Sequence, residues 1–160
     1  MSLEVGFIMI KINIYAIAKP SSDDFDKLSK EFIKMSSKYA KVESFNLFNK
    51  KIAKAQTIGE KEAQQSYSEA FEPYMNGYNI ALDVLGEKLD SFAFANMIEK
   101  STILNFFIGG AYGFERDFLK KCNKIVTLSD LTMAHKIANL VLLEQVFRGL
   151  CIINNHPYHK

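Results

Sequence analysis

Three short stretches in the second half of the chain could together form a ligand pocket. They are Leu82 with Asp83, the glycine-rich segment 105–113 (NFFIGGAYG) and the segment 128–133. Each ends or follows an apolar run with the length and residue types of a buried strand. Because the carboxyl ends of parallel strands share one edge of a sheet, we expect the stretches to meet there. Glycines such as Gly109 let a ligand approach the backbone closely, since they have no Cβ.

The residue types in these stretches favour a flat ligand with polar edges, such as an adenosine. Leucines and a methionine supply apolar walls, Ser129 and Thr132 add hydroxyls, and the glycines expose backbone N–H and C=O groups. The pattern GGxxG by itself fits a tight structural turn equally well. Neither a GxGxxG fingerprint nor a P-loop lysine occurs in the sequence, which argues against a standard dinucleotide or triphosphate site.

A second candidate cluster lies in the last helix that the sequence predicts. Glu144 and Arg148 are spaced i, i+4 and therefore share one helix face. An exposed ion pair of this kind contributes little to stability. Its neighbours, however, are apolar nearly all round between Leu140 and Ile153, and such a helix is buried or faces a partner chain. We therefore interpret the pair as part of an interface or a site.

The chain ends on a polar tail, residues 155–160, which contains His156, Tyr158 and His159. Such side chains suit contact with RNA, through stacking on bases and hydrogen bonds to phosphates. A metal site is the competing interpretation. It is disfavoured because the chain has only 3 histidines and the tail contains no acid.

Composition narrows the class of protein. The 160 residues have a net charge of +2, 48% hydrophobic residues and 24% charged residues, which is ordinary for one soluble domain. Two lysine clusters, within 50–54 and 120–124, fit a solvated surface better than a dedicated nucleic-acid-binding patch. The widely separated Cys122 and Cys151 favour a reduced, cytoplasmic protein.

The beginning of the chain shows no targeting or membrane signal. It lacks the basic region and cleavage site of a signal peptide, and no apolar run approaches the roughly 20 residues of a membrane span. Met9 is a candidate native start, which would make residues 1–8 an upstream extension of a single domain over residues 1–160.

Strands and helices alternate along the chain, so the sequence predicts an α/β fold. In this fold a mostly parallel sheet carries helices on both faces. Strands are expected over residues 10–18, 42–48, 78–85, 102–108 and 124–128, with a turn over 86–88. Helices are expected over residues 23–37, 60–75, about 91–98, 114–121 and 133–154, while residues 50–59 fit a loop or a frayed helix.

Four motifs, in this order, resemble those of the ribosomal RNA large subunit methyltransferase H family. They are IGGAYG at 108–113, LSDLTMAH at 128–135, LEQVFR at 143–148 and NHPYHK at 155–160. The likeness reaches back to LDVLGEKLDS at 82–91 and KINIYAIAK at 11–19, so it covers residues 10–160. The family is a minimal member of the SPOUT class of methyltransferases.

The resemblance implies properties that periodicity alone does not predict. It implies a SPOUT fold, in which the C-terminal part of the chain is threaded into a trefoil knot, and it implies a homodimer. It further implies S-adenosylmethionine as the methyl donor and N3 of a pseudouridine in large-subunit (23S) ribosomal RNA, within the ribosome, as the acceptor. No metal and no membrane are implied.

The resemblance also implies two sets of site residues. The acceptor-side, catalytic set is Glu144, Arg148, Tyr158 and His159; Arg148 and the tail would position the base, and Tyr158 or His159 would handle the N3 proton. The sequence departs from the family in having Asn139 for an arginine and Phe147 for a tyrosine. The positions implied for cofactor binding are Leu82, Gly109, Leu128, Ser129, Asp130, Leu131, Thr132 and Met133.

Two alternatives from other classes remain open at this point. One is a non-catalytic RNA- or nucleotide-binding module that keeps the pocket without transferring a methyl group. The other is a small-molecule α/β enzyme that has no nucleic-acid partner. A methyl-transfer assay on ribosomal RNA that contains pseudouridine separates the three.

Overall fold

The protein is described by a computed structural model of residues 9–160, so the expected extension 1–8 lies outside the described part. Five parallel strands form one sheet in the order β2-β1-β4-β3-β5. The elements in chain order are β1 Ile10–Ile17, α1 Asp24–Ser36, β2 Ala40–Leu47, α2 Lys50–Ile58, α3 Glu60–Phe71, the 3-10 helix η1 Glu72–Tyr74, β3 Tyr78–Lys88, α4 Ser91–Ile98, β4 Ile103–Ile108, α5 Arg116–Lys121, β5 Lys124–Thr127 and α6 His135–Ile153.

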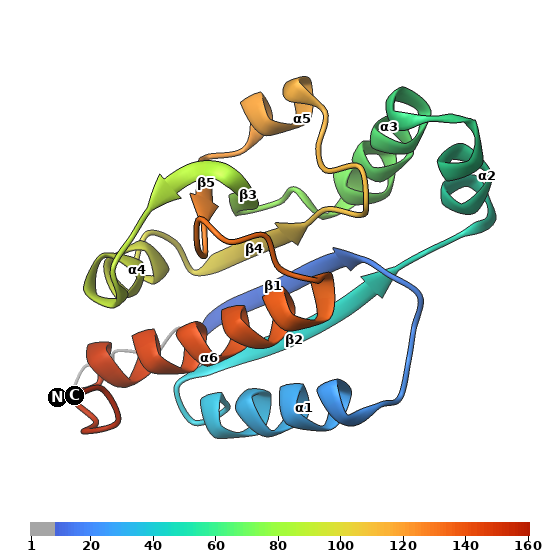
Figure 1. Ribbon diagram of the computed structural model, residues 1–160. Coiled ribbons are helices and arrows are strands. Elements are labelled where there is room, and N and C mark those ends of the chain that lie inside the picture. The colour runs from blue at the N-terminus through green and yellow to red at the C-terminus, as the bar shows by residue number, and fades with distance from the viewer. Residues whose placement is uncertain (1–8) are drawn as a thin grey trace, which may run out of the picture.

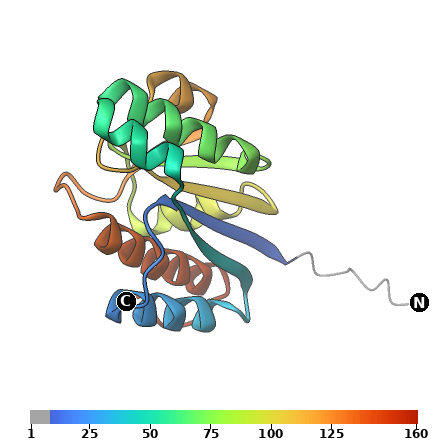
Figure 2. The same ribbon diagram turned by 90° about the vertical axis from the view of Figure 1, so that its right-hand side faces the viewer.

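Helices cover both faces of this sheet (Figures 1 and 2). Helices α1, α4 and α6 pack on one face, and α2, α3 and α5 pack on the other. Alternate residues of β1 serve the two layers: Ile12 and Ile14 belong to the first core, Tyr15 and Ile17 to the second. The predicted parallel α/β sheet with two helical layers is confirmed, and the knot stays a prediction.

The strand register brings the carboxyl ends of β1 and β4 level with Leu82, the last residue of β3 that pairs with β4. Ala16 of β1 pairs with Ile108 of β4, and Ile108 pairs in turn with Leu82 of β3. The residues that follow them therefore emerge side by side at one edge of the sheet. This is the edge at which the sequence predicts a pocket.

Strand β3 continues further than expected, so the predicted turn over 86–88 is wrong. After an irregularity beyond Leu82, Glu87 and Lys88 pair again with β5. Gly86 allows this second pairing, because a Cβ there would lie only 2.6 Å from the backbone carbon of Val126. The glycine that suggested a turn instead permits close approach of two strands.

Residues 50–58 form a complete helix, α2, rather than a loop. Asn49 caps it by accepting a hydrogen bond from the backbone N of Ile52 at 2.8 Å. Ile52 and Ala55 are buried against the second core, and Gly59 follows the last turn. Because lysines surround these two residues, the sequence pattern does not clearly predict the short apolar side of this helix.

Helix α6 begins at His135, two residues later than expected, and packs between α1 and α4. Its apolar residues Leu142, Leu143, Val146 and Leu150 are all buried in the first core. The protein's own sheet and helices therefore account for most of the apolar character that suggested a partner chain. None of the helices within residues 9–160 is long and apolar enough to cross a membrane.

A row of buried asparagines crosses the three central strands. Asn13 of β1, Asn105 of β4 and Asn79 of β3 lie in register, and each is at most 7% exposed. The Nδ2 of Asn13 donates to Oδ1 of Asn105 at 3.0 Å, and Asn105 Nδ2 donates to Oδ1 of Asn79 at 3.1 Å. Asn76 accepts a further bond from Asn105 at 3.0 Å.

Candidate active site

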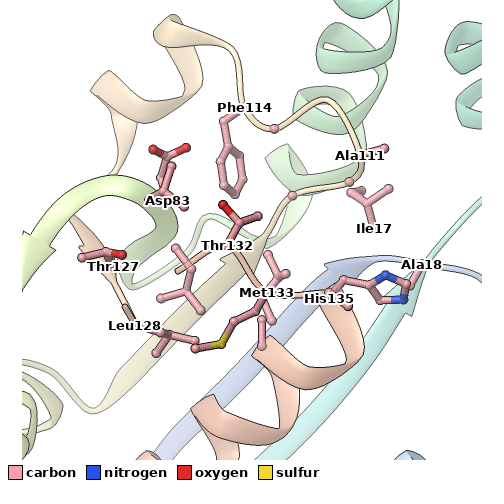
Figure 3. Close-up of a pocket in the computed structure, with 18 of the residues that line it drawn as sticks. Ile17, Ala18, Asp83, Ala111, Phe114, Thr127, Leu128, Thr132, Met133 and His135 are labelled. Atoms are coloured by element: carbon pink, nitrogen blue, oxygen red, sulfur yellow. The ribbon is translucent and has the colours of Figure 1, made fainter. Parts of the chain in front are cut away.

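A pocket of about 650 Å³ opens at the carboxyl edge of the sheet, between β1, β3, β4, β5 and the start of α6 (Figure 3). Its volume lies within the range usual for binding a small molecule. The three stretches singled out in the sequence meet there. They contribute Leu82 and Asp83 within β3, the glycine loop after β4, and the loop that joins β5 to α6.

All but one of the residues predicted to bind a cofactor line this pocket. The exception is Asp130, whose carboxylate lies 2.8 Å from Nζ of Lys88 at the exposed surface. We therefore assign Asp130 to a surface ion pair, made possible by the extension of β3 to Lys88. The lining residues from the predicted set are Leu82, Gly109, Leu128, Ser129, Leu131, Thr132 and Met133.

Hydrogen bonds within the chain fix the shape of the loop over residues 128–133. The hydroxyl of Thr127 donates to the carbonyl oxygen of Ser129 at 2.7 Å. The Ser129 hydroxyl in turn accepts from the backbone N of Leu131 at 3.0 Å. Such local side-chain bonds define the loop without a ligand, so the pocket wall is formed in advance.

Neighbouring side chains pack closely against the glycine loop and leave little room for a Cβ at Gly109 or Gly110. A Cβ on Gly110 would lie 2.6 Å from the ring of Tyr67, and one on Gly109 would lie 3.3 Å from Phe114. Gly113 has a φ of +71°, a left-handed conformation that favours glycine. The loop therefore presents backbone rather than side chains to the pocket, as an adenosine-like ligand requires.

Several pocket residues come from the first half of the chain and were not predicted. They are Lys19 after β1, Phe48 after β2 and Gln56 of α2. The Lys19 Nζ lies 5.3 Å from the centroid of the Phe48 ring. A signal was available, because Lys19 ends the motif KINIYAIAK directly after a strand. Its place beside the glycine loop depends on the strand order, which the sequence does not reveal.

The four predicted acceptor-side residues form one cluster. Arg148 Nε donates to Oε1 of Glu144 at 3.0 Å, and the Tyr158 hydroxyl donates to the same oxygen at 3.1 Å. The Arg148 guanidinium lies over the Tyr158 ring at 4.7 Å, and its Nη1 lies 3.2 Å from Nδ1 of His159. The tail thus folds back onto α6 and brings the four residues together.

The protonation states in this cluster follow from its contacts. Arginine can only donate, so in the contact with Arg148 it is Nδ1 of His159 that accepts, and Nε2 is the ring nitrogen left to donate elsewhere. The hydrogen bond to Glu144 raises the pKa of Arg148. Burial, together with the hydrogen bond to Glu144, raises the pKa of Tyr158. The cluster therefore offers hydrogen-bond donors at neutral pH.

The pocket and the cluster are separate within one chain. The pocket touches α6 only in its first turn, at His135 and Ala138. At a rise of 1.5 Å per residue, Glu144 lies about 9 Å and Arg148 about 15 Å further along the helix. Asn139, at the place of the family arginine, lines a neighbouring hollow of about 130 Å³, where Ser44 Oγ donates to its Oδ1 at 3.4 Å.

No group of three or more His, Cys, Asp or Glu side chains is placed to hold a metal ion anywhere in residues 9–160. Two of the three histidines, His156 and His159, belong to the tail, and the third, His135, lines the pocket.

The comparison with protein families agrees with this architecture. A family model described as "Predicted SPOUT methyltransferase" matches residues 10–159, so the chain is a member of that class. A solved structure, that of a probable methylase family protein from Haemophilus influenzae Rd KW20, superimposes with a TM-score of 0.55 at 14% identity. It covers 93% of this chain and 70% of that one, and at this identity the likeness concerns the fold alone.

Curated relatives are more specific. The Ribosomal RNA large subunit methyltransferase H of Aliarcobacter butzleri is 67% identical over 94% of this chain and 100% of its own length. The protein of the same name from a Nitratiruptor species is 53% identical over 95% of this chain and 100% of its own length. The chain belongs to the ribosomal RNA large subunit methyltransferase H family.

Proposed function

We propose that this protein transfers the methyl group of S-adenosylmethionine to N3 of a pseudouridine in large-subunit ribosomal RNA. The observation that carries the proposal is the pocket at the sheet edge, whose walls include seven of the eight residues at which the family motifs imply cofactor binding. Relatives that share up to 67% of the residues over nearly the whole chain are named as ribosomal RNA methyltransferases.

The pocket fits this cofactor on its own chemistry. Leu82, Leu128 and Met133 provide apolar surface for an adenine ring, and Gly109 lines the pocket with backbone alone, because it has no side chain of its own. When bound, S-adenosylmethionine supplies a positively charged sulfonium from which a methyl group is transferred. The protein contributes a preformed wall, since the hydroxyls of Thr127 and Ser129 already hold the loop.

Alignment is the main catalytic contribution that these residues can make. Holding two reacting atoms about 3–3.5 Å apart accounts for a large share of a transfer barrier. Arg148 supports this role, because its charge is held in place by Glu144 and Tyr158 and suits a phosphate or a base carbonyl. His159 adds a second donor through Nε2. Of the two residues predicted to handle the N3 proton, Tyr158 has a raised pKa and can only donate, so taking this proton stays a prediction for His159.

The separation of the two sites supports a homodimer. A base that accepts the methyl group must touch the pocket, yet Arg148 starts about 15 Å beyond the last helix residue there. In our proposal the cluster of each protomer completes the pocket of the other. Exposed apolar side chains outside the cores, among them Leu28 of α1 and Ile137 of α6, are available for such an interface.

The test is methyl transfer from labelled S-adenosylmethionine to ribosomes or ribosomal RNA that contain pseudouridine. We expect the label in N3-methylpseudouridine after nuclease digestion, and only in the large subunit. With a ribosomal acceptor, the proposal includes a site of action in the cytoplasm. Cofactor binding without transfer to any ribosomal substrate would replace the proposal by the non-catalytic binding module, and absence of cofactor binding would refute both.

A further inference from the structure

The pocket is wider than the set of residues proposed to bind the cofactor. That set belongs to β3, to the loop after β4 and to the loop between β5 and α6, which form one half of the sheet edge. The other half lies at the ends of β1 and β2, and Figure 3 shows its Ile17 and Ala18 on the side opposite Thr127 and Leu128. Four strand spacings, roughly 19 Å, separate β2 from β5. The lining therefore extends beyond the cofactor set by two strands.

The proposed reaction needs this additional part of the pocket. The acceptor nitrogen must approach the methyl carbon to about 3–3.5 Å, so the edge of the base that carries N3 has to enter the pocket beside the cofactor. The lining residues contributed by β1, β2, α2 and the turns after them are Ile17, Ala18, Lys19, Phe48 and Gln56. None of these described residues is acidic, whereas Lys19 and Gln56 carry side-chain donors. This half therefore suits a ligand edge that accepts hydrogen bonds.

Gln56 is oriented so that its amide nitrogen is left for a ligand. The hydroxyl of the buried Tyr67 donates to its Oε1 at 2.5 Å. Burial raises the pKa of Tyr67, so the phenol keeps the proton that this hydrogen bond needs. Tyr67 is itself held in place, because its ring packs against Gly110 of the glycine loop. With Oε1 engaged, the group that Gln56 offers to the pocket is the donor Nε2.

Lys19 supplies a positive charge to the same half of the pocket. Its Nζ lies 5.3 Å from the centroid of the Phe48 ring, and such a cation–π contact positions the ammonium without removing its charge. None of the ion pairs found among residues 9–160 involves Lys19. Asp23 and Asp26, which line the adjoining hollow, are paired with other lysines. The ammonium therefore remains available to a ligand.

The N3 edge of a pseudouridine accepts what these two side chains donate. N3 lies between two carbonyl groups, and both carbonyl oxygens are hydrogen-bond acceptors. When N3 loses its proton, the negative charge spreads onto these oxygens, where donors that are already in place stabilise it. A cytosine, in contrast, presents an amino donor beside its N3, and this group would face a second donor.

We propose that Lys19 and Gln56 bind the two carbonyl oxygens that flank N3 of the acceptor base, and that Tyr67 is a positioning residue for Gln56. The inference rests on the proposed function and adds the residues that hold the acceptor. In the transfer, a bond forms between N3 and the methyl carbon, and the carbon–sulfur bond breaks with its electron pair left on sulfur. The N3 proton passes to a base, for which His159 is the prediction.

Single-turnover transfer to ribosomes and titration calorimetry with S-adenosylhomocysteine together test this subsite. Lys19→Met should lower the rate at saturating ribosomes about a hundredfold, since a charged donor to the developing anion is lost. Gln56→Met should lower it about tenfold, through loss of one hydrogen bond. The ribosome concentration that gives half the maximal rate should change by no more than about twofold. Both variants should bind S-adenosylhomocysteine like the parent protein.

A double-mutant cycle tests the role of Tyr67. Tyr67→Phe removes only the hydroxyl, so Gln56 loses its orientation and the rate should fall about threefold to tenfold. In the background of Gln56→Met the same change should lower the rate no further, because the amide that Tyr67 orients is already absent. A merely structural tyrosine would lower the rate equally in both backgrounds, and that result would refute the positioning role.

Matched controls are Lys61→Met and Gln65→Met, both at exposed positions of α3 outside the pocket lining. They should transfer methyl groups like the parent protein, and melting temperatures verify the fold of every variant. Weakened S-adenosylhomocysteine binding in Lys19→Met or Gln56→Met would assign these residues to the cofactor and overturn the proposal, and unchanged transfer rates would overturn it as well. A parent protein that binds S-adenosylhomocysteine but does not methylate ribosomes would instead refute the proposed function.

Discussion

At the scale of single residues, Gly109 and its neighbours determine whether the loop after β4 can admit a ligand. A side chain at Gly109 would press on the Phe114 ring at 3.3 Å and on Gly113 at 3.4 Å. We expect Gly109→Val to displace the loop and weaken S-adenosylhomocysteine binding at least tenfold, since overpacking costs about 1–3 kcal/mol. Titration calorimetry measures the loss.

Gly59→Ala is the matched control for that experiment. Gly59 lies between α2 and α3, and a Cβ there makes ordinary contact, 3.4 Å from a Glu62 oxygen. The control should bind with the affinity of the parent protein. Equal affinities in all three proteins would remove Gly109 from the cofactor site.

Tyr158 provides a prediction about pH. Burial and the hydrogen bond to Glu144 raise the pKa of its hydroxyl above the usual value, so the phenol stays protonated at neutral and mildly alkaline pH. We expect Tyr158→Phe to lower methyl transfer about threefold to tenfold, through loss of one hydrogen bond. The pH–rate profiles of variant and parent between pH 6 and roughly pH 9 should be parallel.

A change in the shape of that profile would contradict the assignment, because it would mean that the Tyr158 proton leaves within this range. His159→Gln is the informative companion variant. The glutamine amide can still donate a hydrogen bond, so transfer should largely survive if His159 only positions the base. A loss of about a hundredfold or more would instead assign proton transfer to the imidazole.

The sequence predicted which segments form the pocket, but it did not predict which side chains of these segments lie outside the pocket lining. Leu82, Gly109 and all but one residue of the loop over 128–133 line the pocket, because strand ends and motifs depend only on position along the chain. Asp130 lies outside the lining because its partner Lys88 belongs to a part of β3 that the sequence pattern predicts as a turn. Lys19 was missed because its nearness to the glycine loop depends on strand order.

At the scale of elements, the tail separates binding from catalysis. Deleting residues 157–160 removes Tyr158 and His159 but keeps His156, whose backbone N donates to the carbonyl of Cys151 at 2.9 Å and closes the end of α6. The pocket does not include the tail. Cofactor affinity should therefore stay within twofold, while methyl transfer to ribosomes falls by orders of magnitude, on the order of 10²-fold or more.

Calorimetry and the labelled-methyl assay give the two readouts on the same protein preparation. Retained transfer in the truncated protein would show that the tail is a passive end, and the acceptor-side assignment would be withdrawn. Deletion of Lys160 alone is the control, since this residue takes no part in the contacts among Glu144, Arg148, Tyr158 and His159.

Element boundaries show what a sequence pattern can and cannot supply. Strands β1 and β4 were predicted to within a residue, because β1 is rich in isoleucine with imperfect alternation and β4 lies in an apolar run. For α2 the sequence predicts only a loop or a frayed helix, because Ile52 and Ala55 alone mark its buried side, among lysines. The order of the strands, and with it the shared edge, arises from long-range pairing that no local pattern contains.

At the scale of the whole molecule, the proposed dimer is tested on exposed rather than buried residues. Ile137 is 44% exposed on α6, whereas Leu142 is fully buried and its substitution would disrupt the core. We expect Ile137→Glu to give a folded monomer with reduced methyl transfer, because a charge disfavours an apolar interface. Light scattering measures the mass, and circular dichroism verifies the fold.

Ile58→Glu is the matched control, since Ile58 is 60% exposed on α2, which belongs to the opposite helical layer. It should leave both mass and transfer unchanged. A parent protein that is monomeric at micromolar concentration would contradict the homodimer. A dimeric Ile137→Glu variant would place the interface on another surface.

The asparagine row has a consequence for the folding of the chain during its synthesis. Asn13 and its partner Asn105 are separated by 92 positions, and Asn105 must also reach Asn79. During synthesis, β1 therefore emerges long before β4, whose Asn105 accepts the hydrogen bond of the Asn13 amide. Contacts between residues so far apart in the sequence slow folding, and strand edges that are not yet paired are prone to aggregation. The central sheet can assemble only after two thirds of the chain has been synthesised, so we expect a nascent protein that depends on protection until β4 appears.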